Sequence, residues 1–409
     1  MPNYGQPYWT RRAPRPARAT RGAGRPLKGA HTADIVVVGG GLTGCASAYA
    51  LARAGFSVVL VEAETIASGA TSRGMGAVVP TPDTLFVPAK KSAGKAAKVA
   101  FAEAQAGAKG LAATLKKLRI GCDLTSTELL VSAPFTNDAA ELKKEAAARK
   151  AAGLDGVLIG EDAARTRLAT ETRAALRLRD AFVIDPVKAA HGLAAAARKA
   201  GVRIVEGTAV KKTTFTRKDV TIVMAGATIT ATGVVVATGR PGRLFHQLER
   251  HVRVSQGYTV VTEPLTTAMR KAVGSRAALY TESTESPRWI RWLADHRALC
   301  TGLAGPEPAG AKADKAVLQR SNQLMYELSL RYPDISGLPP AFGWDVPVVT
   351  TADGLPWIGP HRNYPFHFFA LALGWHGEAQ AWVAAQAAVR YFTGKPTKSD
   401  ALLGFARAL

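Results

Sequence analysis

The stretch Asp34–Gly44, which reads Asp-Ile-Val-Val-Val-Gly-Gly-Gly-Leu-Thr-Gly, indicates how the rest of the chain is organised. Its four apolar, mostly β-branched residues are typical of a buried parallel strand. Gly39, Gly41 and Gly44 then fit the G-x-G-x-x-G turn that opens a dinucleotide-binding helix. The first glycine permits the tight turn, the second lets a pyrophosphate approach the backbone, and the third lets the helix pack against the strand. The phosphates are expected on the free N–H groups of that helix.

The residues after this stretch supply the context that the motif needs. Residues 42–54 are predicted to form an alanine-rich helix ending at Gly55, and residues 56–61 a second strand. Glu62 follows that strand, 18 residues after Gly44. A carboxylate at this spacing accepts a hydrogen bond from a ribose 2′-hydroxyl and disfavours a 2′-phosphate. FAD or NAD is therefore expected rather than NADP, and a purely structural glycine turn is the weaker interpretation.

The composition limits the class of protein. A chain of 409 residues is long enough for two domains and a substantial core. No apolar run reaches the ~18 residues that span a bilayer, so no membrane span is expected. The three cysteines are widely spaced and lack a C-x-x-C pair. Neither a disulfide framework nor a metal site is therefore predicted, and a cytoplasmic location is expected.

The net charge of +22 raises the possibility of a nucleic-acid or acidic protein partner. Residues 1–32 form a basic N-terminal arm without any acidic residue. The pair Arg11-Arg12 resembles a twin-arginine signal, but no apolar segment follows it, so export is rejected. A targeting leader, a nucleic-acid-binding arm and an extended arm lying on the surface all remain open.

The middle of the chain predicts a small-residue loop and further elements of a nucleotide-binding domain. Residues 66–76 are too glycine-rich for a regular element and are expected as a loop that could run beside a flat ring system. Asp185 is a candidate N-cap for a helix. The predicted helices are 99–119, 138–152 and 186–200, and the predicted strands are 128–132, 202–206, 220–224, 228–230 and 233–239. The last strand ends where a cofactor could lie.

From Arg253 the pattern changes to that of a largely antiparallel sheet. The predicted strands are 253–263, 278–281, 288–293 and 298–302, interrupted later by a helix over 314–330. Alternation places Trp289 and Arg291 on one strand face and Arg288 on the other. One face could line a substrate pocket. A half-buried sheet with its arginines in solvent is the favoured interpretation.

The final section returns to glycine-rich loops. Residues 353–360 are dense in turns and lead to a predicted strand over 366–373. The loop Gly374-Trp375-His376-Gly377 precedes a long apolar helix over 378–392. The N-terminus of that helix carries partial positive charge, which suits an anionic reduced ring.

These ordered motifs resemble the D-amino-acid oxidase (DAO) family of FAD-dependent oxidoreductases, which includes glycine, sarcosine and γ-glutamylputrescine oxidases. The resemblance covers nearly the whole chain. Its carriers are Gly39–Gly44 with Glu62, Ser68–Arg73, Asp185-Pro186, Ala237-Thr238-Gly239, the segment 353–359 and Gly374–Gly377. Tyr8-Trp9 also resembles the aromatic start of the γ-glutamylputrescine oxidase branch.

The resemblance implies an α/β fold with two domains. One is a Rossmann-like FAD-binding domain of the glutathione-reductase type, and the other is a substrate domain with a largely antiparallel sheet and helices. The expected boundaries are 1–32 for the basic arm, 33–95, 181–245 and 344–409 for the FAD-binding domain, and 96–180 and 246–343 for the substrate domain.

The resemblance also implies the chemistry. A hydride leaves the carbon next to a neutral amine for the flavin, giving an imine that water hydrolyses, and oxygen is the usual acceptor of the electrons. The protein then contributes orientation, desolvation and charge stabilisation. The expected partners are a small amine or amino acid and oxygen or another acceptor. Two alternatives remain: a tRNA-modifying flavoprotein acting on a modified uridine, suggested by the charge, and a dehydrogenase subunit of a larger complex.

Departures from the family pattern refine the cofactor and substrate expectations. The cysteine and the histidine that attach flavin covalently in some relatives fall at Val346 and Arg73, so non-covalent FAD is expected. The lysine and arginine that hold a substrate carboxylate in sarcosine oxidases fall at Ala381 and Gly76. An amino-acid substrate would therefore need another anchor.

Several residues are candidates for that anchor or for catalysis. Arg291 or Arg288 could hold a carboxylate, whereas Asp345, Glu378 or Glu263 could recognise a cationic amine, although each acid also has a structural interpretation. His376 is a candidate for the cofactor site and for a general base. The expected catalytic residues are His376, Arg291, Asp345 and Glu378. The expected cofactor-binding residues are Gly39, Gly41, Gly44, Glu62, Ser68, Thr71, Ser72, Arg73, Val210, Gly239, Gly374, Trp375, His376 and Gly377.

Overall fold

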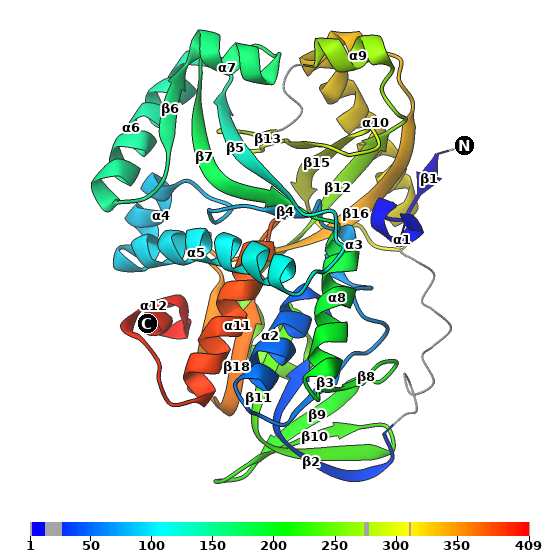
Figure 1. The fold of residues 1–409 in the computed structure, drawn as a ribbon, viewed down its shortest axis with the longest axis vertical. Helices are drawn as coiled ribbons and strands as arrows, with labels where there is room; N and C mark the ends of the chain where they lie inside the picture. The colour runs from blue at the N-terminus through cyan, green and yellow to red at the C-terminus, as the bar shows by residue number, and fades with distance from the viewer. Residues whose placement is uncertain (1, 13–26, 274–277, 311, 409) are drawn as a thin grey trace.

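The computed structural model describes residues 2–12, 27–273, 278–310 and 312–408. These residues form two sheets, which Figure 1 shows one above the other with helices packed around and between them. The arginines at 15, 18, 21 and 25 of the predicted basic arm lie outside the described residues.

The lower, eight-stranded sheet carries the stretch Asp34–Gly44. Its strand order is β17 (Trp357–His361), β18 (Tyr364–Leu371), β11 (Ala227–Gly239), β2 (Gly29–Val38), β3 (Val58–Val61) and β8 (Arg203–Val205). The strands from β18 to β8 are parallel, and β17 is antiparallel to β18. Strands β9 (Val210–Phe215) and β10 (Val220–Met224) extend β11 as an antiparallel meander.

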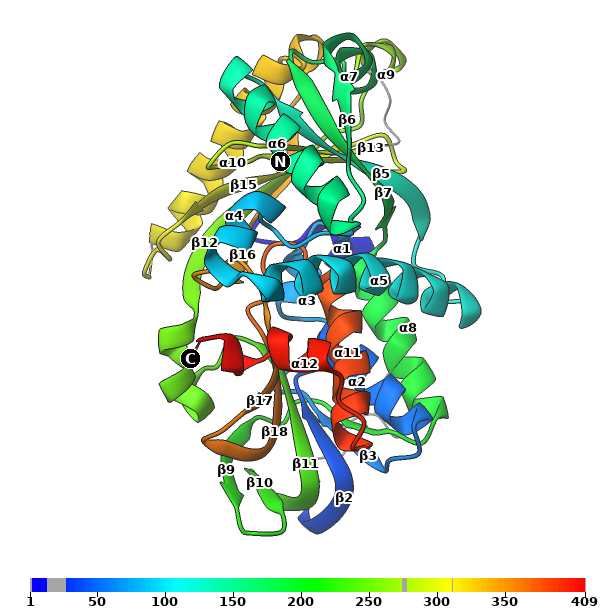
Figure 2. The ribbon, with the colours of Figure 1, turned by 90° about the vertical axis from the view of Figure 1, so that its left-hand side faces the viewer.

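Both faces of this sheet are buried, which explains the unbroken apolar run of β2. Val37 belongs to the core beneath the helices, whereas Val36 and Val38 belong to a second core on the opposite face. Helices α2 (Leu42–Arg53), α8 (Pro186–Lys199) and α11 (Glu378–Phe392) lie side by side over the first face (Figures 1 and 2). As predicted, Asp185 caps α8 by accepting from the N–H groups of Val187 and Lys188.

One strand prediction in this sheet is corrected. Residues 228–230 and 233–239, predicted as separate strands, are parts of the single strand β11. The two predicted strands are continuous because the pairing with β2 does not stop between them. Ala231 and Gly233 of β11 pair with Ala33 and Ile35 of β2.

The upper, ten-stranded sheet is largely antiparallel, as predicted. Its order is β1 (Asn3–Tyr4), β16 (Pro340–Thr350), β12 (Arg253–Thr262), β15 (Ala298–Gly305), β14 (Trp289–Trp292), β13 (Ala278–Glu282), β5 (Thr125–Ala133), β7 (Ala174–Val183) and β4 (Ala77–Val78), with β6 (Val157–Gly160) beside β7. Two of its pairs are parallel, β1 with β16 and β13 with β5. Because β16 lies in this sheet, the predicted domain boundary at 344 falls inside a strand, and the domain boundaries stay a prediction.

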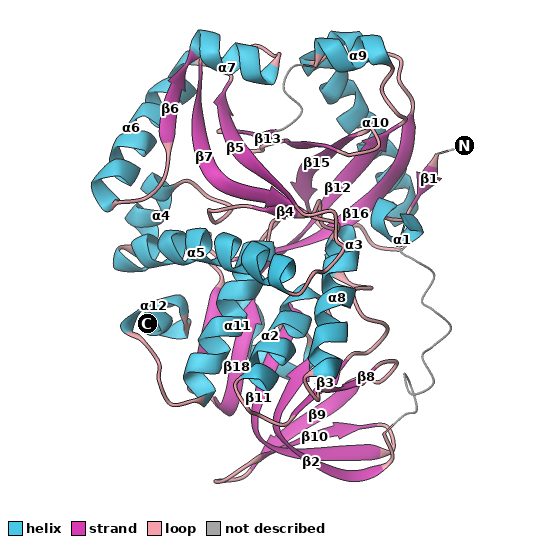
Figure 3. Cartoon of the chain, in the orientation of Figure 1, coloured by secondary structure: helices cyan, strands magenta, loops and turns pink. Residues whose placement is uncertain are grey.

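Six further helices cover the upper sheet and the space between the sheets (Figure 3). They are α4 (Phe86–Ala93), α5 (Lys95–Lys117), α6 (Thr136–Ala152), α7 (Glu161–Leu168), α9 (Thr267–Ala272) and α10 (Lys312–Arg331). Helix α12 (Lys398–Leu403) packs instead against α5 and against β17 of the lower sheet. Helix α5 approaches the start of α11 closely, since a Cβ added to Gly107 would lie 2.6 Å from the carbonyl oxygen of Ala379. Among the described residues, no helix is long and apolar enough to cross a bilayer. Cys45, Cys122 and Cys300 are free and buried.

The loop predicted over 66–76 contains one regular element, the helical turn α3 (Ala70–Arg73), so this prediction is wrong in part. Small hydroxyl side chains stabilise the turn despite the glycines around it. The Ser72 hydroxyl donates back to the carbonyls of Ser68 and Gly69, at 3.0 and 2.9 Å.

Residues 3–12 do not lie extended on the surface, so that interpretation is wrong for this part of the basic arm. Asn3 and Tyr4 form β1, and Tyr8 and Trp9 of α1 (Tyr8–Arg12) are each only 2% exposed. The Trp9 indole donates to the carbonyl oxygen of Gly74 at 2.7 Å. Burial of these two large aromatic side chains stabilises the packing of this short segment against the rest of the protein.

We expect Trp9→Ala to lower the free energy of unfolding by about 3–5 kcal/mol, because it removes a large buried side chain and leaves a cavity. Trp9→Phe removes part of the buried ring and the indole donor, and the lost hydrogen bond should contribute about 0.5–1.5 kcal/mol to the total cost. Urea unfolding followed by circular dichroism measures both. A stability for Trp9→Ala within 0.5 kcal/mol of the unmutated protein would contradict the role of this segment.

Candidate functional site

A cavity of about 640 Å³ opens at the carboxyl ends of the parallel strands β2, β3 and β11. Its wall includes Gly39 after β2, Glu62 after β3, and Thr238 and Gly239 at the end of β11. This edge is where open parallel sheets bind ligands. The volume lies within the roughly 300–1,000 Å³ of small-molecule sites.

The three motif glycines have different tasks in the structure. Gly39 has φ +108°, and a Cβ there would lie 2.6 Å from the carbonyl oxygen of Ala237. Gly41 lines the cavity, where a Cβ would lie 3.0 Å from the Thr71 hydroxyl. Gly44 does not line the cavity; a Cβ there would overlap the carbonyl oxygen of Gly39. The turn therefore needs Gly39 for both conformation and close approach, and Gly41 and Gly44 for close approach.

Glu62 lies in the cavity wall with its carboxylate held by backbone donors. One oxygen accepts from the N–H of Gly40 and the other from the N–H of Glu64 at 2.9 Å. Because each carboxylate oxygen has further lone-pair capacity, the group can still accept from a ribose hydroxyl.

The segment 68–73 borders the same cavity and is tied to the glycine turn. Ser68 and Thr71 line the cavity, and the Thr71 hydroxyl accepts from the N–H of Leu42 at 2.9 Å. Ser72 is buried behind the wall, and Arg73 turns away to form an ion pair with Asp345. Thr71 therefore joins this loop to the first turn of α2.

The other end of the cavity is formed by β16 and by the loop before α11. Val346 and Pro347 of β16 line it, as do Gly374, Trp375 and Gly377 of the loop. Trp375 packs against Gly257 of β12, where any Cβ would overlap its ring. The cavity therefore runs from the lower sheet to the underside of the upper sheet.

Asp83, which the sequence analysis did not identify, holds this second loop in place. Its carboxylate accepts from the N–H of Trp375, and burial raises the pKa of the Asp83 carboxyl to about 7. Gly374 has φ +81°, and a Cβ there would overlap that carboxylate. No sequence signal connects the two positions, because 292 residues separate Asp83 from Trp375.

His376 is buried behind the loop rather than in the cavity wall. It is 2% exposed, and its ring centroid lies 4.0 Å from that of Trp289. Neither ring nitrogen has a hydrogen-bond partner, and burial lowers the pKa of the imidazole to about 3. His376 is therefore neutral at physiological pH and packs as an aromatic side chain.

Arg291 is buried, so the favoured interpretation of a solvent-facing side chain is wrong. One of its terminal nitrogens donates to the carbonyl oxygens of Met75, Gly76 and Ile184, at 2.6, 3.1 and 2.8 Å. Its guanidinium also lies over the Trp9 ring, 5.0 Å from the centroid. Burial lowers the pKa of Arg291 to about 10, so the group stays charged at neutral pH. These bonds join the segment before β4 to the residue after β7, whereas the Arg291 Nε has no hydrogen-bond partner.

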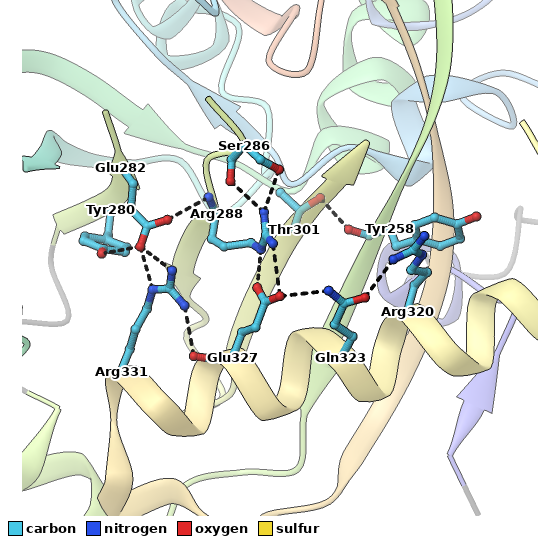
Figure 4. Close-up of polar contacts among 10 residues, drawn as sticks. All are labelled: Tyr258, Tyr280, Glu282, Ser286, Arg288, Thr301, Arg320, Gln323, Glu327 and Arg331. Carbon is cyan, nitrogen blue, oxygen red and sulfur yellow. Dashed lines mark hydrogen bonds and ion pairs between the residues drawn. The ribbon is translucent and has the colours of Figure 1, made fainter. Parts of the chain in front are cut away.

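Arg288 is also buried, on the opposite face of the sheet, and the solvent interpretation is wrong for it as well. Figure 4 shows its guanidinium reaching Glu327 on α10 and the Ser286 carbonyl. Glu282 in turn pairs with Arg331. This network joins the β13–β14 turn to α10, because buried charges need partners. Arg288 therefore lies behind the sheet, away from the cavity.

Asp345 and Glu263 lie outside the cavity wall. Asp345 pairs with Arg73 and accepts from the Gln256 side chain at 2.6 Å. Glu263 follows β12 and pairs with Arg297 at 3.0 Å. Of the four expected catalytic residues, only Glu378 borders the cavity.

The structure brings most of the expected cofactor-binding residues to one cavity. Those in its wall are Gly39, Gly41, Glu62, Ser68, Thr71, Val210, Gly239, Gly374, Trp375 and Gly377. Gly44, Ser72, Arg73 and His376 lie behind the wall. Lining residues that the sequence analysis missed include Glu64, Thr208, Arg240, Leu244 and Pro347. Thr208 reaches the wall because its N–H donates to the Glu62 carbonyl at 2.9 Å, a contact between distant segments.

These residues fit an FAD. A glycine turn that a Cβ would fill lies at one end, beside an acid able to accept from a ribose. At the other end, Gly377 and Glu378 border the cavity at the first turn of α11, and Gly377 at the N-cap position has no side chain to cap the helix N–H groups. Free N–H groups at such a helix start stabilise negative charge on a ring system.

Comparisons with known proteins agree with this fit. Residues 34–391 match the family model DAO, described as FAD dependent oxidoreductase. The chain is 23% identical over 375 residues to the probable oxidoreductase OrdL of Haemophilus influenzae, covering 88% of this chain and 83% of that protein. It is 25% identical over 332 residues to the gamma-glutamylputrescine oxidoreductase of Escherichia coli, covering 80% of this chain and 76% of that protein.

Solved structures share the fold. Glycine oxidase from Geobacillus kaustophilus superposes with a TM-score of 0.74 at 20% identity, covering 91% of this chain and 97% of that one. L-amino acid deaminase from Proteus vulgaris superposes with a TM-score of 0.75 at 20% identity, covering 93% and 98%. The predicted fold class is confirmed by these likenesses.

We expect Gly374→Ala to reduce the FAD content of the purified protein at least tenfold, because the new methyl group would collide with Asp83 and displace the Trp375 loop. Gly394→Ala is the matched control. Gly394 also has positive φ, +70°, but nothing lies within 4 Å of an added Cβ. The control should keep its FAD and lose only about 1 kcal/mol of stability. Equal FAD content in both variants, measured by absorbance after acid release, would rule out the proposed contact.

Proposed function

This chain belongs to the DAO family of FAD-dependent oxidoreductases, and we propose that it oxidises the carbon–nitrogen bond of a small amine or amino acid. The observation that carries the proposal is the single cavity that joins the dinucleotide turn to the loop Gly374–Gly377 beneath the upper sheet. The names of the relatives, which include a gamma-glutamylputrescine oxidoreductase and a glycine oxidase, support the same type of substrate.

FAD, when bound, supplies the two-electron acceptor for this oxidation. The residues of the chain contribute binding, orientation and exclusion of water. The turn at Gly39 and Gly41 would hold the diphosphate, and Glu62 the ribose. Trp375, packed on Gly257, forms part of the wall at the far end. The start of α11 would offer N–H groups to negative charge.

The attachment of the cofactor and the electron acceptor are further parts of the proposal. Non-covalent binding is supported by Val346 and Arg73, neither of which offers a nucleophile at the position where relatives attach flavin. Arg73 is moreover paired with Asp345. Oxygen is the proposed acceptor, and a cytoplasmic location stays a prediction from the cysteine pattern.

The matches do not favour the two alternatives from the sequence analysis. The hypothesis of a tRNA-modifying flavoprotein rested on the net charge. No sequence motif supported the hypothesis of a subunit of a larger complex. Three of the relatives and structural neighbours reported above are named for reactions of an amine or amino acid instead.

The purified protein should show a flavin absorption spectrum that bleaches when an amine or amino acid is added without oxygen. Acid precipitation should release the flavin into the supernatant, because no covalent bond is expected. Peroxide release on readmission of air would identify oxygen as the acceptor, and dye reduction without peroxide would replace it with another acceptor. A protein that cannot be reconstituted with FAD would remove the proposal.

A further inference from the structure

We propose that Glu378 takes the proton of the substrate's ammonium group and that the negative charge of Glu378 makes the site select amines without a carboxylate on the reacting carbon over α-amino acids. This inference rests on the proposed oxidation of a carbon–nitrogen bond and names the substrate class within it.

The position of Glu378 is the first observation. It is the first residue of α11, borders the cavity and is only 7% exposed. Its Oε2 has no hydrogen-bond partner, whereas Oε1 faces Gly74, where an added Cβ would lie 3.5 Å away. A buried carboxyl oxygen without a donor is costly. An ammonium group offers three N–H donors and would satisfy it.

The second observation is the distribution of positive charge. The charged side chains among the described residues of the wall are Glu62, Glu64, Glu378 and Arg240. Arg240 directly follows β11, the strand whose Ala237 carbonyl packs against Gly39, and so belongs to the dinucleotide turn rather than to α11. A substrate carboxylate beside Glu378 would therefore meet a like charge, and no described wall residue at this end of the cavity supplies a compensating positive charge.

Neither arginine that could have compensated lines the cavity. Arg291 donates through one terminal nitrogen to three carbonyl oxygens and lies over Trp9, and Arg288 pairs with Glu327 behind the sheet. A rotation of Arg291 toward the cavity would leave buried carbonyl oxygens without their donor, which costs about 1–3 kcal/mol for each unsatisfied group. The anchors expected for an α-amino acid are thus absent from the described wall of the cavity.

The proton transfer is balanced. The N–H bond of the substrate ammonium breaks and an O–H bond forms on Glu378, leaving a neutral amine with a free lone pair and a neutral carboxylic acid. A neutral amine is the form from which hydride can leave the neighbouring carbon. Burial favours the neutral acid that results.

Electrostatics support this role and give it a pH dependence. Burial raises the pKa of the Glu378 carboxyl to about 8; its own backbone N–H lowers it, Asp83 raises it, and Arg291 and the Gly76 N–H lower it. His376, on the preceding loop, is neutral, and α5 approaches through Gly107. The carboxylate is the proton acceptor, so it is available above its pKa and blocked below it. The rate constant kcat/KM should rise as pH increases to about 8.

The experiment compares amines with their α-carboxylated counterparts in the FAD-loaded protein: ethylamine with alanine, n-butylamine with norvaline, benzylamine with phenylglycine and putrescine with ornithine. Anaerobic flavin bleaching gives the rate from pH 6 to 10. Within the best pair the amine should be at least tenfold more efficient, and its profile should fall below pH 8. Glu378→Gln should lower kcat/KM by about 10²-fold or more and remove that limb.

Glu263→Gln is the matched control, because Glu263 is paired with Arg297 outside the cavity. It should keep both the rate and the pH profile. Binding is measured separately by calorimetry with tert-butylamine, which has no hydrogen on the reacting carbon; its Kd should rise at least tenfold in Glu378→Gln and stay unchanged in Glu263→Gln. Should Glu378→Gln fail to fold, the paired substrates and the pH profile of the unmutated protein decide alone.

The outcomes separate this inference from the proposed function. Faster bleaching by the amino acids, or an unchanged pH profile in a folded Glu378→Gln protein, overturns the role of Glu378 and leaves the oxidoreductase proposal standing. Flavin that dithionite reduces but no amine or amino acid bleaches contradicts both.

Discussion

The close approach of backbone to backbone between β2, β11 and α2 is the constraint on which the rest of the structure depends. Gly39 and Gly44 stand where any Cβ would meet a carbonyl oxygen, of Ala237 or of Gly39 itself. Two strands and a helix can therefore converge on one turn without side chains between them. This convergence opens the cavity at the strand ends and fixes the direction of α2.

The far end of the cavity depends on contacts between segments distant in sequence. Asp83 holds the loop before α11, Arg291 holds the segment before β4, and Trp9 of the N-terminal segment packs on Arg291 and bonds Gly74. Each contact places a buried polar or charged group against backbone atoms, and such groups are costly unless paired. These contacts join the N-terminal segment, the segment before β4 and the loop before α11 where the two sheets meet.

Buried charge is used differently on the two faces of the upper sheet. Behind the sheet, Arg288, Glu327, Arg331 and Glu282 pair with one another and fasten α10. On the cavity side, Arg291 pairs with carbonyl oxygens and Glu378 keeps one oxygen without a partner. The charged side chains behind the sheet are therefore paired with one another, whereas on the cavity side the unpartnered oxygen of Glu378 can still accept a hydrogen bond from a ligand.

Local sequence patterns predicted most of the secondary-structure elements and the dinucleotide end of the cavity. The glycine spacing, the apolar run of β2 and Glu62 predicted the dinucleotide turn, and helix α11 begins and ends where its pattern indicated, because these signals depend on neighbouring residues alone. The sequence could not place Arg288, Arg291, Asp83 or Tyr8 and Trp9, because alternation along a strand gives its two faces but not what covers them. Which of the candidate acids borders the cavity was likewise decided by tertiary structure: Asp345, Glu263 and Glu378 are chemically alike, and the pairing of the first two with arginines distinguishes them from the third.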